Sequence, residues 1–191
     1  NIQNYGPIAR GVGVKGEYCT NMFQQSRQTI LNFFGLNNCS THTVVYTKSD
    51  TEALNILANI LINDDEDMIL TTRMEHHAND LPFRRVGKVV HVDVDELGRI
   101  NIDDIKEELI KANGKIKVVT VTGASNVTGY MTPIHDIAKL AHKYNAIIIV
   151  DAAQLIAHKK INMMGTCEEE SIDFLTFSAH KAYAPFGSGA I

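Results

Sequence analysis

The chain has 191 residues, a net charge of -4 at pH 7 and an ordinary globular composition, with 45% hydrophobic and 21% charged residues. The slightly acidic balance gives no support to a nucleic-acid partner or to an anionic membrane surface, and the apolar runs are strand-sized, far shorter than a membrane span. Three widely spaced cysteines, Cys19, Cys39 and Cys167, form neither a disulfide framework nor a CxxC metal pair, so we expect a reducing compartment, the cytoplasm.

Strand-like apolar runs alternate with helix-period segments along most of the chain. In chain order, the sequence predicts a helix over 15–34, a strand over 41–47, a helix over 51–62, strands over 68–70 and 89–94, a helix over 102–112, a strand over 115–123, a helix over 133–144, and strands over 146–151 and 172–177. The helix over 51–62 is apolar on all sides, which predicts burial. This alternation predicts an α/β fold with a mostly parallel sheet flanked by helices.

Both ends of the chain look cut. The first residue is Asn1 rather than methionine, and Gly189 to Ile191 reads as the opening of another strand. We therefore expect a piece of a longer protein. We divide it into an N-terminal segment with the first helix (1–40) and a large domain (41–191).

Polar residues follow several of the predicted strands. In parallel sheets, ligands bind outside the carboxyl ends of the strands, so these residues are expected to converge on one edge. They are Ser49, Asp50, Thr51, His76, Ser125, Asn126, Asp151, Gln154, Ser178, His180 and Lys181.

Lys181 comes shortly after the apolar run SIDFLTF and just after two residues that could bind an anion, Ser178 and His180. A loop lysine is normally solvated. Here Gly187 and Gly189 would let the backbone pass close to a ligand, and a lysine kept from water beside other cations is a usable nucleophile toward a carbonyl. The pattern favours a reactive lysine.

Asp151 follows four aliphatic residues at a strand end and has two interpretations. It could be the N-cap of a helix over 152–157. It could instead be a carboxylate held at the sheet edge to pair with a cation. The residue type leaves both open.

Two further patterns are weaker. Residues 11–16, GVGVKG, match the GxGxxG spacing of dinucleotide-binding proteins, but no strand precedes them and no acid follows at about 20 positions. A flexible loop is favoured there over the site of an NAD-type oxidoreductase. Glu75-His76-His77 has no partner pair at metal-ligand spacing, so it does not predict a metal site, although one functional histidine remains open.

Four motifs, TRMEHHAND, ASNVTG, VDAAQ and FSAHK, resemble class V aminotransferase-fold enzymes in their order and spacing. The closest resemblance is to the cysteine desulfurase and selenocysteine lyase branch, and it covers about 47–191. It implies the large domain of a fold type I enzyme that depends on pyridoxal 5'-phosphate (PLP).

The resemblance implies a role for each residue near the reacting end of the cofactor. Lys181 would form the Schiff base with PLP and then move the substrate's α proton, and His76 would stack on the ring and take part in proton transfer. Asp151 would pair with the pyridinium nitrogen and so make the ring an electron sink. Gln154 would hydrogen-bond the phenolic oxygen, and Asn126 would lie near that oxygen and the substrate carboxylate.

The resemblance also implies a phosphate site. Thr51 would bind the phosphate at a helix N-terminus, and Ser178 with His180 would complete the cup. The family usually has glycine and a small residue where this chain has Ser49 and Asp50. A carboxylate beside a phosphate dianion is repulsive unless it points away.

The function that the resemblance implies is that of a cysteine desulfurase, which converts L-cysteine to L-alanine and enzyme-bound sulfur, as a homodimer that could serve a sulfur-acceptor protein. Family members are about twice as long, and their second half supplies a substrate-binding arginine and the sulfur-accepting cysteine, which none of the three cysteines here matches. We therefore expect this piece alone to be inactive. The alternatives are a class V aminotransferase, epimerase or other lyase, and a truncated, non-catalytic PLP-binding fragment.

Overall fold

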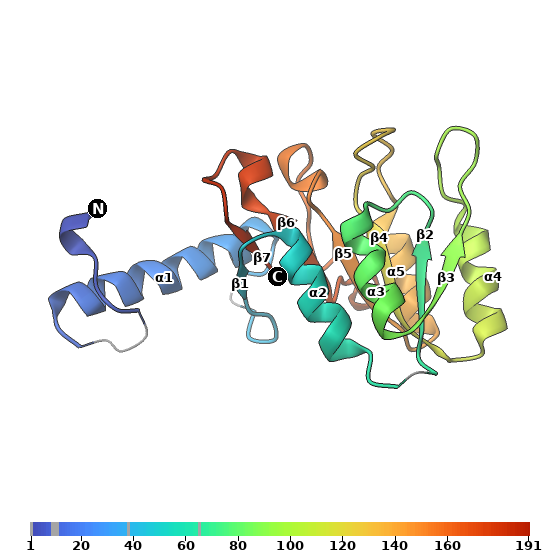
Figure 1. The fold of residues 1–191 in the computed structure, drawn as a ribbon, viewed down its shortest axis with the longest axis horizontal. Coiled ribbons are helices and arrows are strands. Elements are labelled where there is room, and N and C mark those ends of the chain that lie inside the picture. The colour runs from blue at the N-terminus through green and yellow to red at the C-terminus, as the bar shows by residue number, and fades with distance from the viewer. Residues whose placement is uncertain (1, 9–11, 38, 65) are drawn as a thin grey trace. The chain divides into compact units, whose positions relative to one another are not determined.

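A computed structural model describes residues 2–8, 12–37, 39–64 and 66–191, which form two compact units, Asn1–Val44 and Val45–Ile191 (Figure 1). The first unit contains a 3-10 helix, η1 (Ile2–Asn4), and a long helix, α1 (Val14–Phe33), close to the predicted helix. Gly11 lies outside the described residues. Gly13 has a φ of 78° and turns the chain directly into α1, so residues 14–16 are helical and the expected flexible loop is wrong for them.

The second unit alternates strands and helices, as the sequence predicts. In chain order its elements are β1 (Tyr46–Thr47), α2 (Asp50–Leu61), β2 (Met68–Thr72), η2 (His77–Asn79), α3 (Leu81–Val86), β3 (Lys88–Val92), α4 (Ile102–Ala112), β4 (Ile116–Thr122), α5 (Ile134–Lys143), β5 (Ile147–Asp151), η3 (Leu155–Ala157), η4 (Glu168–Glu170), β6 (Phe174–Ser178), η5 (Ala179–Ala182) and β7 (Gly189–Ala190). None of the helices that the structure describes is long and apolar enough to cross a membrane.

The strands form one sheet in the order β1-β7-β6-β5-β4-β2-β3. All neighbouring pairs are parallel except those of β7, which is antiparallel to both β1 and β6. The predicted mainly parallel α/β fold is therefore confirmed. The strand expected over 41–47 is wrong for most of its length, because β7 is itself short and pairs only Tyr46 and Thr47 within the ladder.

Helices cover both faces of the sheet (Figure 1): α2 and α3 pack on one, α4 and α5 on the other. The α3 helix was not predicted. It begins with a proline in its first turn and places Phe83, fully buried, in the core. A hydrophobic core lies between α2, α3 and the central strands. Its buried residues are Leu54, Leu57, Ala58, Ile62, Ile69, Ala78, Phe83, Val118 and Ile149.

The α2 helix is buried on one face only. Leu54 and Leu57 face the core, whereas Ile56 and Ile60 are exposed. The expectation of burial on all sides is wrong, because a helix in the outer layer of this fold has only one face against the sheet. The N-terminus of α2 lies at the same edge of the sheet as the loops that follow β4, β5 and β6 (Figure 1), and this edge carries the candidate site.

Candidate active site

A cavity of about 290 Å³ lies at the carboxyl ends of the parallel strands. Every residue that the resemblance assigns to the cofactor lines it, whereas Ser125, also expected at this edge, does not. Its full lining is Ser49, Asp50, Thr51, His76, Ala78, Thr122, Ala124, Asn126, Asp151, Ala153, Gln154, Ser178, His180 and Lys181. The topology thus brings together side chains from five separate segments of the chain, as expected for a parallel sheet.

The N-terminus of α2 is fixed by hydrogen bonds on both sides. Ser49 is its N-cap, and Ser49 Oγ accepts from the Glu52 N–H at 3.2 Å, while Glu52 Oε2 accepts from the Lys48 N–H at 2.6 Å. This arrangement is a variant of the capping box. The Asp50 N–H donates to Ser178 Oγ at 2.8 Å, across 128 residues of sequence. The start of α2 is therefore held directly against the end of β6, with Thr51 exposed to the cavity.

His76 is exposed and caps η2: its Nδ1 accepts from the Ala78 N–H at 3.1 Å. In the neutral imidazole, Nε2 then carries the proton. The ring is therefore fixed in orientation, with an N–H available as a donor.

The residue before it, Glu75, belongs to a polar network that the sequence did not reveal. Its carboxyl accepts from Thr72 Oγ1 at 2.6 Å and from Asn79 Nδ2 at 2.7 Å. Asn79 Oδ1 in turn accepts from Thr120 Oγ1 at 2.6 Å. Burial raises the pKa of Glu75 to about 8 against the effect of these hydrogen bonds. The network ties the His76 segment to β2 and β4.

Asp151 ends β5 and is only 2% exposed. Its Oδ1 accepts from the Ala153 N–H at 2.9 Å. It does not cap a helix, because the chain forms only the short η3, whose N-cap is Gln154. The N-cap interpretation is therefore wrong. Burial raises the pKa of Asp151, although the Ala153 N–H and the Lys181 charge act in the opposite direction.

Asp50 is the first residue of α2 and is only 5% exposed. Its carboxyl group interacts with the carboxyl group of Asp151 and with the Thr176 hydroxyl. Its Oδ1 is buried and has no hydrogen-bond partner among the described residues. Burial, with the charge of Asp151, raises the pKa of Asp50 to about 7. The sequence placed this residue at the sheet edge and as a departure from the family pattern, but gave no sign of its burial.

Lys181 lies in η5, immediately after β6. It is exposed, so the expectation of a lysine kept from water is wrong: η5 places it at the open side of the cavity. The neighbouring His180 is half-buried and stacks on Phe186 with ring centroids 5.4 Å apart. Within the described part of the chain, His180 Nδ1 is buried and has no hydrogen-bond partner. Lys181 still acts electrostatically on both Asp50 and Asp151.

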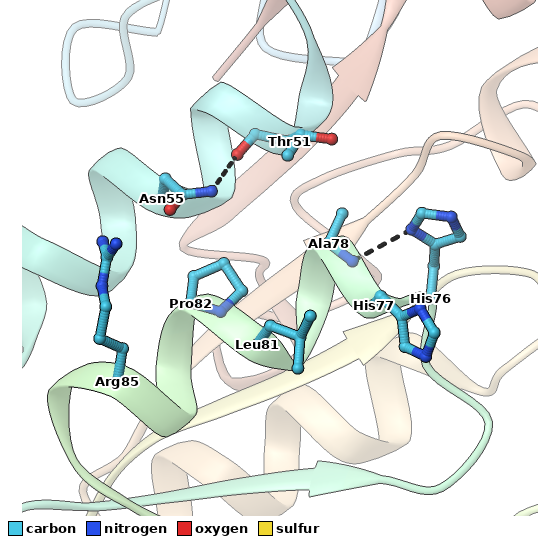
Figure 2. Close-up of a pocket in the computed structure, with 8 residues that line it drawn as sticks. All are labelled: Thr51, Asn55, His76, His77, Ala78, Leu81, Pro82 and Arg85. Atoms are coloured by element: carbon cyan, nitrogen blue, oxygen red, sulfur yellow. Dashed lines mark hydrogen bonds between the residues drawn. The ribbon is translucent and has the colours of Figure 1, made fainter.

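A second cavity, of about 460 Å³, adjoins the first and shares Thr51, His76 and Ala78 with it (Figure 2). Its other walls come from α2 and α3, and Arg85 extends from α3 toward α2. The space around His76 is thus open on the side of α3 as well as on the side of Asp151.

Comparison with known proteins shows the family of the chain. The sequence profile of the aminotransferase class-V family matches residues 2–191. The chain belongs to this family. It is 32% identical over 195 residues to a probable cysteine desulfurase of Halalkalibacterium halodurans, covering 96% of this chain and 45% of that protein. It is 31% identical over 180 residues to a cysteine desulfurase of Synechococcus elongatus, covering 90% of this chain and 27% of that protein.

The fold is also that of solved family members. The structure of a cysteine desulfurase from Thermococcus onnurineus NA1 superposes with a TM-score of 0.86 and 29% identity, covering 99% of this chain and 46% of that one. This class V chain therefore spans less than half the length of these three relatives.

Proposed function

We propose that the protein is a PLP-dependent cysteine desulfurase that removes sulfur from L-cysteine and leaves L-alanine. The observation that supports this most strongly is the single cavity that joins Lys181, Asp151 and His76 in a class V fold. Cysteine desulfurases are prominent among its relatives, and they favour this activity over that of an aminotransferase, epimerase or other lyase.

The residues of the cavity have the chemistry that PLP requires. A phosphate needs hydrogen-bond donors, and Ser178 Oγ, which accepts the Asp50 N–H, still has its own O–H to donate. His180 Nδ1, buried without a partner among the described residues, adds a second donor when protonated. The first turn of α2, with Thr51, adds backbone N–H groups and the positive end of the helix dipole.

The opposite end of the cavity suits the ring. Asp151 offers a buried carboxylate oxygen to a ring N–H, and Gln154 and Asn126 offer amide groups to a phenolic oxygen. Exposed His76 can lie on the ring face. The bound cofactor supplies an electron sink for the negative charge that develops on the substrate.

Lys181 has two tasks in this proposal. Its Nζ would hold the cofactor covalently, which requires the neutral amine as nucleophile. As a free amine it would accept the proton from the substrate's α-carbon. The exposed position of Lys181 gives the amine the freedom to move between these tasks. His76 Nε2–H is a donor of fixed orientation in the same cavity for a second proton transfer, since its Nδ1 accepts from the Ala78 N–H.

The proposal extends to the assembly and partners of the whole protein. We infer a homodimer in the cytoplasm, with a sulfur-acceptor protein as the recipient of the sulfur. These inferences rest on the family. Measurement of the molecular mass of the whole protein in solution, with and without an acceptor protein, would test the homodimer and the complex with the acceptor.

Borohydride reduction of the PLP-treated protein, followed by peptide mapping, tests the central assignment. The pyridoxyl group should be found on Lys181. Lys181→Ala should lose the visible absorbance of the bound cofactor and, in the whole protein with an added thiol reductant, the release of sulfide from cysteine. Exposed Lys159 provides the matched control, and Lys159→Ala should retain both. Labelling of another lysine would refute the role of Lys181, whereas labelled Lys181 with amino transfer to a keto acid and no sulfide would favour an aminotransferase.

A further inference from the structure

Two acids, Asp50 and Asp151, are buried side by side at the base of the candidate active site. They are 5% and 2% exposed. They come from different elements, the start of α2 and the end of β5, and the bond from the Asp50 N–H to Ser178 Oγ fixes the first of these against the sheet.

Two buried carboxylates that are both ionised repel each other unless a nearby positive charge or a proton neutralises one of them. The described charged or titratable groups that act on the pair are Lys181, His76 and Glu75, with His180 also lining the cavity. Lys181 is exposed and makes no ion pair with either acid among the described contacts. Like charges in a poorly solvated site are relieved when one acid keeps its proton.

The contacts also indicate which acid keeps it. Asp151 Oδ1 accepts the Ala153 N–H at 2.9 Å, a bond that favours the ionised form. Asp50 Oδ1 is buried and accepts no hydrogen bond from a described residue, an environment that penalises a charge far more than a neutral acid.

We propose that the two carboxyl groups hold one proton between them, with Asp50 as the protonated member that donates its O–H to the Asp151 carboxylate. Asp50 is then a positioning residue. Its O–H and the Ala153 N–H together fix the orientation of the Asp151 carboxylate, the charged group that the proposed function pairs with the cofactor ring. Only the consequence for the cofactor rests on the proposed function; the shared proton itself does not.

The proton can be observed directly, without cofactor. Titration of the aspartate carboxyl carbons by NMR in the purified, PLP-free protein should show one aspartate with a midpoint near pH 7. This measurement is blind to His76, His180 and Lys181, and Glu75 is resolved by its different carbon. Asp50→Asn should abolish the step, and Asp136→Asn, at an exposed site, should leave it unchanged.

A second pair of variants tests positioning. The amide introduced by Asp50→Asn can still donate to Asp151, whereas the side chain introduced by Asp50→Leu cannot. We expect Asp50→Asn to keep the PLP affinity of the wild type at pH 6, and Asp50→Leu to weaken it about tenfold, as for the loss of one hydrogen bond to a charged group. Equal affinities in the two variants would refute the positioning role.

The outcomes separate the two proposals. If every aspartate titrates below about pH 5, or the neutral step persists in Asp50→Asn, the shared proton is refuted, whatever PLP does at Lys181. If the step is present but no pyridoxyl group is trapped, the carboxyl pair stands and the proposed function falls. Should the variants fail to fold, a wild type in which every aspartate titrates below about pH 5 still refutes the shared proton, and a wild type with one aspartate step near neutral pH supports it.

Discussion

Two buried aspartates of similar exposure, Asp80 and Asp50, have opposite electrostatic fates. Asp80 is 8% exposed and Asp50 5% exposed. Burial acts to raise the pKa of both. For Asp80, hydrogen bonds and charge from Arg84 and His91 outweigh burial and lower the pKa. For Asp50, the neighbour is a second acid, and the pKa rises to about 7.

The partners therefore decide the outcome. Arg84 Nε donates to Asp80 Oδ1 at 2.8 Å, Arg84 Nη2 lies 2.6 Å from Oδ2, and His91 Nε2 lies 2.9 Å from Oδ1. Asp50 has a hydroxyl, an acid and a distant lysine around it. A buried carboxylate with cations beside it stays ionised and forms part of the structural framework. A buried carboxyl group that keeps its proton near neutral pH is typical of functional sites, where protonation states matter.

The largest effect is expected when the ionised cluster loses its charge. Asp80→Asn removes the acceptor of Arg84 and His91, and we expect the free energy of unfolding in urea at pH 7 to fall by about 2 to 3 kcal/mol. Because the pKa of Asp80 is lower in the folded state, its contribution is present above its unfolded pKa and is lost as pH falls, so the variant should also be less sensitive to acid.

Asp95 provides the control for this variant. It pairs with Arg99 on the surface, where both side chains are largely exposed, and Asp95→Asn should have no measurable effect. Equal losses in the two variants would show that the Asp80 cluster is no stronger than a surface pair.

A carboxyl that keeps its proton should tolerate replacement by an amide. Burial raises the pKa of Glu75 to about 8, so at pH 7 Glu75→Gln preserves the shape and the neutral state. The glutamine oxygen can accept from Asn79, and its amide can donate to the Thr72 hydroxyl, which now accepts the hydrogen bond that it donated to Glu75. We expect a cost below about 1 kcal/mol for this change, and about 2 kcal/mol for Glu75→Ala, which leaves buried polar groups unpaired. Denaturant unfolding would measure both.

The pH dependence gives this prediction its sign. The folded pKa of Glu75 is raised, so its proton stabilises the folded state at low pH and that stabilisation is lost as pH rises through about 8. Glu75→Gln should remove this loss, which develops between the unfolded pKa of 4.5 and the folded pKa of about 8. A variant as damaging as Glu75→Ala at pH 7 would mean that Glu75 is ionised there, like Asp80.

The smallest effect is expected at the hydroxyl beside the carboxyl pair. Thr176 is fully buried on β6 and its hydroxyl lowers the pKa of Asp50. Thr176→Val keeps the shape, so stability should change by less than about 1 kcal/mol, while the Asp50 midpoint in the NMR titration should move upward. A midpoint that stays or falls would show that the hydroxyl plays no part.

Sequence pattern predicted most of the fold for a physical reason. Strands such as β4 and β5 are buried on both faces, so their apolar runs are conspicuous, and the helices between them keep a clear period. The α3 helix was missed because its six residues are too few to show a period. The short β1 was overestimated because its length depends on β7, far along the chain.

The sequence predicted which residues lie at the site, but it did not predict their burial or their pKa values. Strand ends and the family resemblance identified residues that do line one cavity. Burial of individual side chains was beyond the pattern: Lys181 proved exposed and Asp50 buried. An acid in the first turn of a helix normally suggests a solvated group near the dipole. Only the approach of Ser178 and Asp151 makes this one different.

The hydrogen bond between Asp50 and Ser178 has a consequence for the order of folding during synthesis. Its partners are 128 residues apart, and β1 and β7 pair across a similar separation. Contacts between such distant residues form late, and a chain emerging from the ribosome cannot form them until the strand that bears Ser178 is available. Until then Asp50 is an ordinary solvated acid, so the nascent chain would gain its neutral-pH proton only when the last strands dock.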